Sequence, residues 1–370
     1  VRTAVDKYLN TKNRVVLRFR PEKSSKASDV AIDRTKVPEL GGDKPFRAPD
    51  VKSAKLENGM DIYVVEKPEL PKGAISRATR AGSVADSTGK AGLSVMTGRI
   101  MRRGTNTRNA IQIDETLGNL GTTLFNGTAK ESSNFNMEVL KRNLGPAMNV
   151  MADVVLNPSF PAAEFDREKK LALDNLAQTA SNPNAVANRV ATMIAFGADH
   201  PYGRPSGGLP ASMQAITRDD LVAFHKSYWK PGSSALVFVG DITLAEATAL
   251  ARQQFGSWTG GSAPAVSIAA TKPMSSGKVY LIDRPGSAQT VIAHILTAPE
   301  RKSGDYYALA LANTVYGGGF GTRLNLNLRE DKGWSYGVFA FPQHFTKGGT
   351  WIANGGVQTD KTKESAVEFV

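Results

Sequence analysis

Residues 92–105 read Gly-Leu-Ser-Val-Met-Thr-Gly-Arg-Ile-Met-Arg-Arg-Gly-Thr, and this stretch decides how the chain is interpreted. It contains no His, Cys, Asp or Glu, the side chains whose lone pairs bind zinc in proteins. Val95 offers no donor atom, and Arg99 carries a permanent positive charge. The stretch therefore provides neither a metal ligand nor a carboxylate that could act as a general base.

The composition is that of a globular protein. The 370 residues are 41% hydrophobic and 22% charged, which is enough for about two domains with cores of their own. No run of 18 apolar residues occurs, so we expect no membrane-spanning helix. The absence of cysteine excludes disulfides and Cys-based metal sites. It fits any compartment, with mild compatibility with an oxidising one, so the location stays unknown and a periplasmic one is only weakly favoured over a cytoplasmic one.

The net charge of +12 raises the hypothesis of nucleic-acid binding. The basic residues are scattered, however, and no known nucleic-acid-binding module is present, so we expect no nucleic-acid partner. Attraction for acidic ligands or an acidic partner surface is the simpler interpretation of the charge.

Two α/β units are expected after an N-terminal segment. The alternation in Asn13-Arg-Val-Val-Leu-Arg-Phe-Arg20 predicts a strand, and the Pro-, Lys- and Ser-rich residues 21–50 predict a linker. The first unit is expected over residues 51–260. Its predicted elements are a strand after the Asn58-Gly59 turn, helices over about 162–180 and from Thr217, a buried strand at 235–239, and a helix from the Thr243–Glu246 capping box to about Trp258.

The second unit is expected over residues 261–370. Its predicted elements are strands at 279–283, 290–295, 338–341 and 351–353 and a helix from about Asp305. The sequence stops inside a predicted helix, and we expect a helix and a strand that would close this sheet to be missing. The two units share their order of elements, which indicates a weak internal repeat.

Several stretches together resemble the M16 (insulinase-like) metallopeptidases, whose His-x-x-Glu-His motif has the frame of residues 92–105. The resembling stretches are Leu56–Met60, Ala81–Ser83, Gly89–Leu93, Gly104–Thr105, Asn157–Pro161, His200–Gly203, Tyr228–Pro231, Val239–Asp241, Gly317–Leu324 and Leu328–Tyr336. The resemblance implies an α/β (α+β) fold of two tandem units, each with a mostly antiparallel sheet flanked by helices. It also implies that residues 1–20 are the tail of a preceding unit.

The resemblance assigns a degenerate zinc site to this chain. Val95 and Arg99 stand at the two His positions, Gly98 at the Glu position and Asn175 at the third ligand, while Glu168 matches a supporting carboxylate. No metal is therefore expected here, and zinc is expected in a partner half. The four histidines, His200, His225, His294 and His344, have no spacing for a shared metal and are expected to be structural.

Arg329 and Tyr336, seven positions apart, stand where the family keeps a substrate-binding pair. The resemblance implies a non-catalytic half of a zinc endopeptidase, inactive alone, whose partners are a zinc-bearing half (fused upstream or separate) and a peptide substrate. A structural scaffold subunit is the alternative. Gly317, Gly318, Gly319 and Gly321 predict a flexible loop, because glycine permits unusual backbone angles. Residues 126–131 resemble a peptide-binding edge strand, and the sequence leaves open whether they bind peptide here.

Overall fold

The computed structural model describes residues 2–9, 12, 14–18, 41–42, 45–274 and 277–369. Two compact units are present, Val1–Ala48 and Pro49–Val370. The first holds α1 (Arg2–Tyr8), followed by residues 14–18 without regular structure. The predicted strand is wrong for these residues, since Val15 and Leu17 are 97% and 91% exposed and no neighbouring strand pairs with them. Most of the predicted linker, residues 21–40 and 43–44, lies outside the described residues.

The unit Pro49–Val370 begins with a six-stranded sheet in the order β1-β2-β6-β3-β5-β4. All neighbouring pairs are antiparallel except β2 and β6, which run parallel. The strands are β1 (Lys52–Lys55), β2 (Asp61–Glu66), β3 (Lys72–Thr79), β4 (Phe125–Thr128), β5 (Ser133–Leu140) and β6 (Ser234–Gly240). The predicted Asn58-Gly59 turn is confirmed, because Gly59 has a φ of +90° that favours glycine and β2 follows it.

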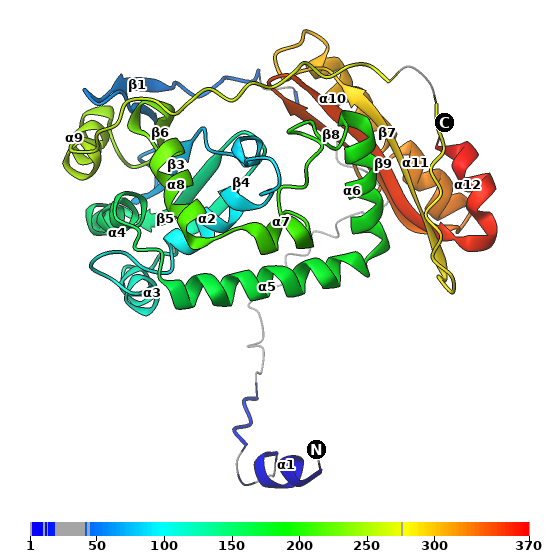
Figure 1. Ribbon diagram of the computed structural model, residues 1–370, viewed down its shortest axis with the longest axis horizontal. Helices are drawn as coiled ribbons and strands as arrows, with labels where there is room; N and C mark the ends of the chain where they lie inside the picture. The colour runs from blue at the N-terminus through cyan, green and yellow to red at the C-terminus, as the bar shows by residue number, and fades with distance from the viewer. Residues whose placement is uncertain are drawn as a thin grey trace, which may run out of the picture. The chain divides into compact units, whose positions relative to one another are not determined.

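Helices pack beside this sheet, as Figure 1 shows. They are α2 (Leu93–Met101), α3 (Ala110–Asn119), α4 (Leu144–Leu156), α5 (Ala162–Ala180), α7 (Pro210–Ala215), α8 (Arg218–Tyr228) and α9 (Leu244–Phe255), whereas α6 (Pro183–Phe196) lies against the second sheet described below. Side chains of Thr217 and Thr243 cap α8 and α9, as the sequence predicts. Helix α9 ends at Phe255 instead of Trp258, and Gly256 follows it.

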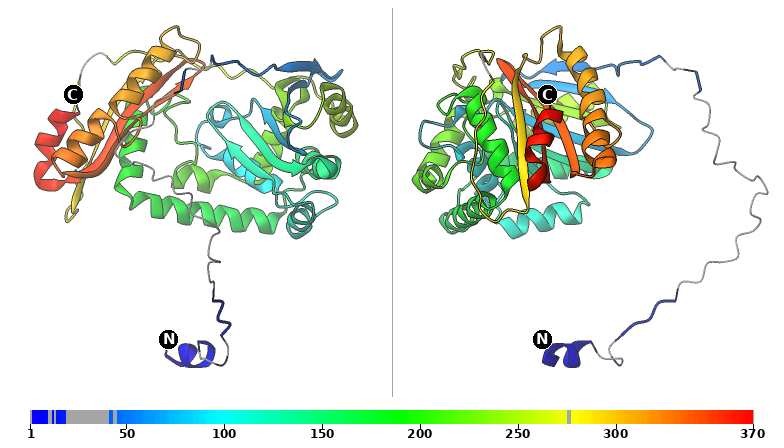
Figure 2. Two further views of the ribbon diagram at one scale, coloured as in Figure 1. Left: turned by 180° about the vertical axis from the view of Figure 1, so that it is seen from behind. Right: turned by 90° about the vertical axis from the view of Figure 1, so that its right-hand side faces the viewer.

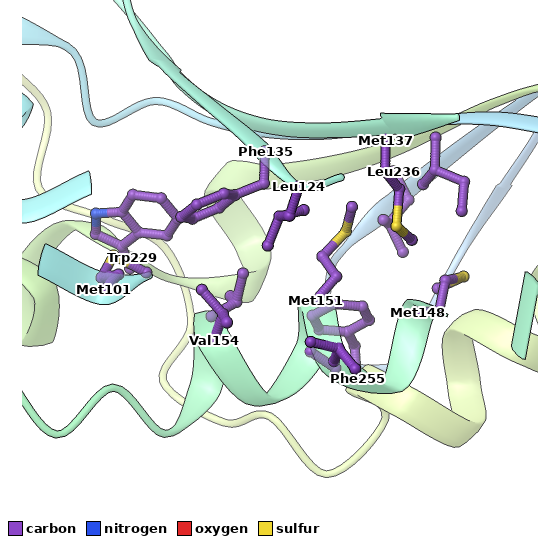
Figure 3. Packing of buried hydrophobic residues seen from close by; sticks show 14 of the residues in the cluster. Met101, Leu124, Phe135, Met137, Met148, Met151, Val154, Trp229, Leu236 and Phe255 are labelled. Carbon is purple, nitrogen blue, oxygen red and sulfur yellow. The ribbon is translucent and has the colours of Figure 1, made fainter. Parts of the chain in front are cut away.

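The main hydrophobic core lies between the six-stranded sheet and these helices. Figure 3 shows sheet residues such as Phe135 and Leu236 facing Met151 and Val154 of α4. All four are buried, each with an exposure of 0%. Core side chains of this size each contribute about 2 kcal/mol through burial, so the core fixes how α4 and α9 lie against the sheet.

A second sheet of three strands has the order β7-β9-β8, with antiparallel pairing throughout. It consists of β7 (Gln289–Ala298), β8 (Ser335–Phe345) and β9 (Gly348–Gln358), accompanied by α10 (Tyr306–Tyr316), α11 (Arg323–Asn325), the π-helix η5 (Leu326–Asp331) and α12 (Thr362–Glu368). Figure 2 shows these elements from two further sides. A smaller core, which includes Leu328, Val338 and Ala353, lies beneath it.

The predicted fold class is confirmed as a mixed α/β protein whose sheets are mostly antiparallel and flanked by helices. The strand predicted at 279–283 is wrong, since these residues have no regular structure. No helix among the described residues combines the length and apolarity that crossing a membrane requires.

Candidate functional site

Helix α2 carries the residues singled out by the sequence, and a buried carboxylate holds its first turn. Asp86 accepts hydrogen bonds of 2.8 Å from the backbone N–H groups of both Gly92 and Ser94. A negative charge at a helix N-terminus is favourable because the free N–H groups point towards it. Burial nevertheless raises the pKa of Asp86 to about 6, against the lowering effect of these hydrogen bonds.

One face of α2 lies against the edge strand β4. Val95 and Arg99, one helical turn apart, are half-buried, and Gly98 is buried. A Cβ atom added at Gly98 would lie 3.5 Å from Asn126 Nδ2 and 3.6 Å from Thr128 Oγ1. The structure therefore brings the degenerate motif face and the 126–131 segment together, with ordinary van der Waals room for a side chain at position 98.

Helix α5 contributes the other two positions of the assigned site. Asn175 is exposed, and its backbone oxygen accepts a hydrogen bond from Thr179 Oγ1 at 2.7 Å. Glu168 is buried and forms ion pairs with Arg103 at 2.8 Å and Arg167 at 3.0 Å. The retained carboxylate thus pairs with guanidinium groups at the end of α2 and on its own helix.

The donor set of this site does not fit zinc. Valine and glycine side chains have no lone pair to give, and a guanidinium is a cation. Among the residues that the structure describes, no group of three or more His, Cys, Asp or Glu is arranged to hold a metal ion.

Each of the four histidines, which are expected to be structural, contacts a backbone carbonyl. Ring nitrogens of His225, His344, His200 and His294 lie 2.8–3.2 Å from the backbone carbonyls of Val155, Pro299, Ala269 and Phe369, respectively. Burial lowers the pKa of His225 to about 4, so this side chain is neutral at pH 7.

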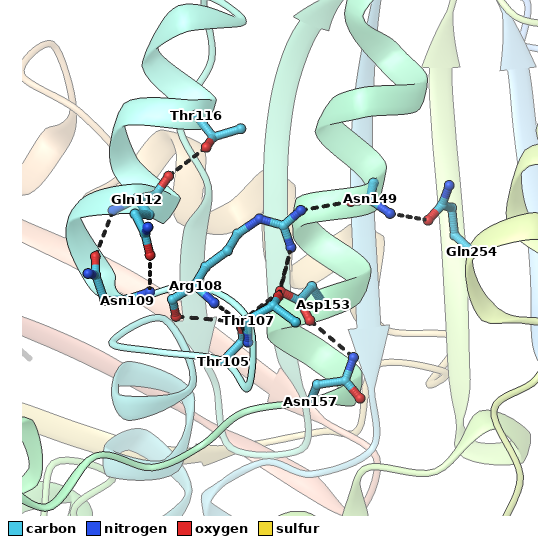
Figure 4. Close-up of polar contacts among 10 residues, drawn as sticks. All are labelled: Thr105, Thr107, Arg108, Asn109, Gln112, Thr116, Asn149, Asp153, Asn157 and Gln254. Atoms are coloured by element: carbon cyan, nitrogen blue, oxygen red, sulfur yellow. Dashed lines mark hydrogen bonds and ion pairs between the residues drawn. The ribbon is translucent and has the colours of Figure 1, made fainter.

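A polar cluster, missed by the sequence analysis, fixes the loop that follows α2 (Figure 4). Asp153 of α4 accepts hydrogen bonds from Thr105 Oγ1 at 2.7 Å, from Thr107 Oγ1 at 2.9 Å and from Arg108 Nη1 at 2.5 Å. Burial acts to raise the pKa of Asp153, but the hydrogen bonds outweigh it and keep that pKa below its ordinary value. These contacts anchor the far end of α2 to the core.

Arg329 and Tyr336 lie on neighbouring elements of the second sheet. Arg329 belongs to η5, where its Nη1 donates to Glu330 Oε1 at 2.6 Å and its guanidinium lies 5.2 Å from the Phe320 ring centroid. Tyr336 is near the start of β8 and is 90% exposed. Among the described contacts, none joins the two side chains directly, and both face solvent at least in part.

The glycine segment before η5 is partly fixed by packing. The backbone oxygen of Gly317 accepts a hydrogen bond of 2.7 Å from Ala340 N, and a Cβ atom at Gly317 would lie 2.7 Å from the Ala340 Cβ. A Cβ atom added at Gly318 would lie 3.1 Å from the Cα atom of Thr314. A Cβ atom added at Gly319 or Gly321 would have no heavy atom within 4 Å. The open end of the segment is therefore the part next to α11, and its flexibility stays a prediction.

A contact between the two sheets was also not foreseen. Glu131 Oε1 accepts hydrogen bonds from Tyr202 Oη at 2.6 Å and Thr346 N at 3.2 Å. The Tyr202 ring lies 4.5 Å from that of Phe345, between centroids. Burial, followed by the bond to Glu131, raises the pKa of Tyr202 to about 12, so the phenol remains a donor. The edge segment 126–131 is in this way tied to the β8–β9 turn.

Comparison with known proteins agrees with this architecture. Residues 64–205 match the family model described as insulinase (peptidase family M16), and residues 215–370 match the one described as peptidase M16 inactive domain. An "uncharacterized zinc protease" of Mycobacterium leprae is 27% identical over 307 residues, covering 83% of this chain and 69% of that protein.

Two solved structures share the fold. The peptidase M16 inactive domain from Pseudomonas fluorescens superposes with a TM-score of 0.80 at 27% identity, covering 86% of this chain and 78% of that one. A protease from Helicobacter pylori gives a TM-score of 0.81 at 18% identity, covering 86% of this chain and 79% of that one, a likeness of fold alone. With both family models matched in sequence order, the chain belongs to the M16 peptidase family, and its residues 215–370 match that family's inactive-domain model.

Proposed function

We propose that this chain is the non-catalytic half of a zinc endopeptidase and that it donates hydrogen bonds to a peptide held at the zinc site of a partner half. One observation carries the proposal. The α2 face has no metal-binding donor at Val95, Gly98 or Arg99, while the donors Arg329 and Tyr336 are retained and open to an approaching surface.

The chemistry asked of Arg329 and Tyr336 is electrostatic. Peptide hydrolysis develops negative charge on the carbonyl oxygen of the scissile bond, and preorganised N–H and O–H donors stabilise that charge. A zinc ion in the partner half would polarise the same carbonyl as a Lewis acid. Donors from this chain would contact the same carbonyl oxygen from the side opposite the zinc. Loss of one such donor typically raises the activation barrier by about 3 kcal/mol.

The ion pair between Arg329 and Glu330 is compatible with this role. The side chains are 40% and 52% exposed, and such surface pairs contribute only about 0–1 kcal/mol. Because the pair is weak, a substrate carbonyl in a drier, closed site can compete with Glu330 for the guanidinium. The aromatic face of Phe320 helps to keep the guanidinium in place.

The domain boundaries belong to the same proposal. Residues 51–260 carry the degenerate site, residues 261–370 carry the Arg/Tyr pair, and residues 1–20 are the tail of a preceding unit joined by residues 21–50. Support for the tail comes from its likeness to the α8–β6 segment, since Tyr8 and Tyr228 each precede an apolar stretch at the same spacing. A periplasmic location remains a prediction from the absence of cysteine.

A scaffold subunit is the second candidate, and one observation favours it. Arg329 is already paired with Glu330, and no described contact brings it to Tyr336. A scaffold would need neither side chain, whereas a substrate-binding half would need both.

The proposal is tested by adding the purified chain to an M16 half that carries a complete His-x-x-Glu-His motif. We expect the dialysed chain to hold far less than one zinc per molecule and to cleave no peptide, and we expect peptide cleavage by the zinc-bearing half to rise when the chain is added. Zinc near one per chain, or cleavage that is the same with and without the chain, would contradict the proposal.

A further inference from the structure

Arg329 is carried by an unusual helical turn. It lies in the π-helix η5, and Tyr336 follows at the second position of β8. A π-helical turn closes backbone hydrogen bonds between residues five positions apart, is rare, and occurs frequently at functional sites. In η5 a bond of this kind runs from Lys332 N to Asn327 O at 3.1 Å. Because such a turn is intrinsically less favourable than an α-helical one, contacts from other elements are needed to hold it.

Glu368 of α12 provides these contacts on both sides of the turn. Its Oε2 accepts a hydrogen bond of 2.5 Å from Asn327 Nδ2, and its Oε1 pairs with Lys332 Nζ at 2.5 Å. Figure 1 shows α12 close to α11, which η5 continues. Asn327 and Lys332 are the same two residues that the backbone bond of the π-turn joins. One carboxylate therefore links both ends of the turn, with Arg329 between them.

The contacts of Glu368 are charge-assisted and partly shielded from water. The side chains of Lys332 and Glu368 are each 29% exposed. The hydrogen bonds from Lys332 and from Asn327 hold the pKa of Glu368 below its ordinary value, so the carboxylate is charged at pH 7. A charged carboxylate is a stronger acceptor than a neutral amide. Two such bonds from one side chain constrain the turn more than a single exposed ion pair would.

The segment after the turn is fastened to β9. Gly333 N donates to Arg329 O at 3.2 Å, and Gln358 Nε2, at the end of β9, donates to Gly333 O at 3.0 Å. The backbone N–H of Gln358 donates to Trp334 O at 2.9 Å. Gly333 itself has a φ of +63°, which favours glycine. The path from Arg329 to Tyr336 is thus anchored to α12 before Gly333 and to β9 after it.

We propose that Glu368 is a positioning residue for Arg329: it holds the π-turn so that the guanidinium is already oriented to donate to a carbonyl oxygen of the peptide substrate. Preorganised donors stabilise developing charge because they do not have to reorganise during the reaction. A donor that must first be ordered loses part of this advantage, and small misplacements lower rates strongly. This inference rests on the proposed function, because it concerns the orientation of a donor that acts on the substrate.

The test measures peptide cleavage by the full chain together with a zinc-bearing M16 half. In Glu368→Gln the amide oxygen can still accept from Asn327, but the ion pair with Lys332 is lost. We expect kcat to fall by about tenfold or more and KM to change by less than about twofold, because the affected donor acts in the transition state. The matched control is Glu364→Gln, which removes an exposed carboxylate one turn earlier on α12 and should leave kcat unchanged.

Two further measurements separate a positioning role from a purely structural one. In a chain that already carries Arg329→Ala, Glu368→Gln should cause no further fall in kcat, since both changes act on one donor. Hydrogen exchange of the Lys332 and Gly333 amides should become faster in Glu368→Gln, while exchange in the six-stranded sheet stays the same, because only the π-turn loosens.

The outcomes distinguish this inference from the proposed function. Unchanged kcat in Glu368→Gln, where Arg329→Ala lowers it, would overturn the inference and leave the proposed function standing. An equal fall in kcat with and without Arg329 would also overturn it, because Glu368 would then act by another route, and so would unchanged exchange at Lys332 and Gly333. If Arg329→Ala itself leaves kcat unchanged, the proposed function fails and this inference fails with it.

Discussion

Glu168 of α5 and Arg103, just beyond the end of α2, form an ion pair in which Oε1 and Nη2 are 2.8 Å apart. The Glu168 side chain is 7% exposed and that of Arg103 is 32% exposed. At the equivalent position of the M16 motif, the carboxylate would support a metal ligand, but in this chain the guanidinium of Arg103 neutralises Glu168. The carboxylate therefore stabilises the packing of α5 on α2 in a site that lacks metal donors.

Removal of Arg103 should destabilise the fold. In Arg103→Ala, Glu168 stays buried with only the half-exposed Arg167 as partner, so we expect a loss of about 2 kcal/mol in the free energy of unfolding. Arg167→Ala is the matched control and should cost less than about 1 kcal/mol. Urea unfolding measures the free energy of unfolding of both variants. Equal losses would show that the ion pair between Glu168 and Arg103 stabilises the fold no more than the pair between Glu168 and Arg167.

The neutral His225 should make stability depend on pH. Its pKa is about 4 in the folded state, below the ordinary value of 6.5, so the unfolded chain binds the proton more readily between these values. Stability from this group is complete above pH 6.5 and falls by up to about 3 kcal/mol as the pH drops to 4.

The effect of His225 is isolated by comparing the parent chain with His225→Gln, because Asp86 with its raised pKa acts in the opposite direction over much of this range. The difference in unfolding free energy between parent and variant should shrink as the pH falls from 6.5 to 4. A constant difference for His225→Gln would mean that His225 titrates normally.

Two glycines should respond oppositely to alanine. Gly98 lies within α2 with room for a Cβ atom, so Gly98→Ala should stabilise the protein by about 0.5–1 kcal/mol through helix propensity. In Gly317→Ala the new Cβ would meet Ala340 at 2.7 Å and should cost about 1–3 kcal/mol. Thermal unfolding measures the stability of both variants. If Gly98→Ala also destabilises the protein, the space beside Gly98 is filled by another group and the expectation is wrong.

The assignment of the degenerate site predicts that a zinc site can be restored. Val95→His combined with Arg99→His places two imidazoles one turn apart on α2, and Asn175→Glu supplies a carboxylate from α5. We expect the triple variant to retain about one zinc per chain after dialysis, and the variant without Asn175→Glu to retain less. No gain of zinc by the triple variant would show that position 175 does not reach the α2 face.

Local signals in the sequence were sufficient for the helices. The Thr217 and Thr243 capping residues and the apolar periodicity of residues 162–180 act within a few residues, and α8, α9 and α5 form where they predict. The strand predicted at 279–283 depends on a partner far along the chain, and none of the described strands provides it. Strand propensity without a neighbour therefore misled the prediction.

The site was predictable only where residues share one element. The spacing of Val95 and Arg99 placed both on one helical face, and the structure agrees. The pairing of Glu168 with Arg103 and the contacts of Glu131 with Tyr202 and Thr346 join residues from different elements. No local pattern encodes such contacts, so the three-dimensional structure was needed to find them.

The central claim is that Arg329 and Tyr336 donate to a reaction whose zinc lies on a partner half. The most direct measurement is kcat/KM for peptide cleavage by the assembled halves, with Arg329→Ala and Tyr336→Phe tested singly. We expect each to lower kcat/KM by about 100-fold, while the exposed controls Arg323→Ala and Tyr307→Phe leave it unchanged and all four variants assemble normally. Unchanged kcat/KM for both Arg329→Ala and Tyr336→Phe would contradict the claim and favour the scaffold.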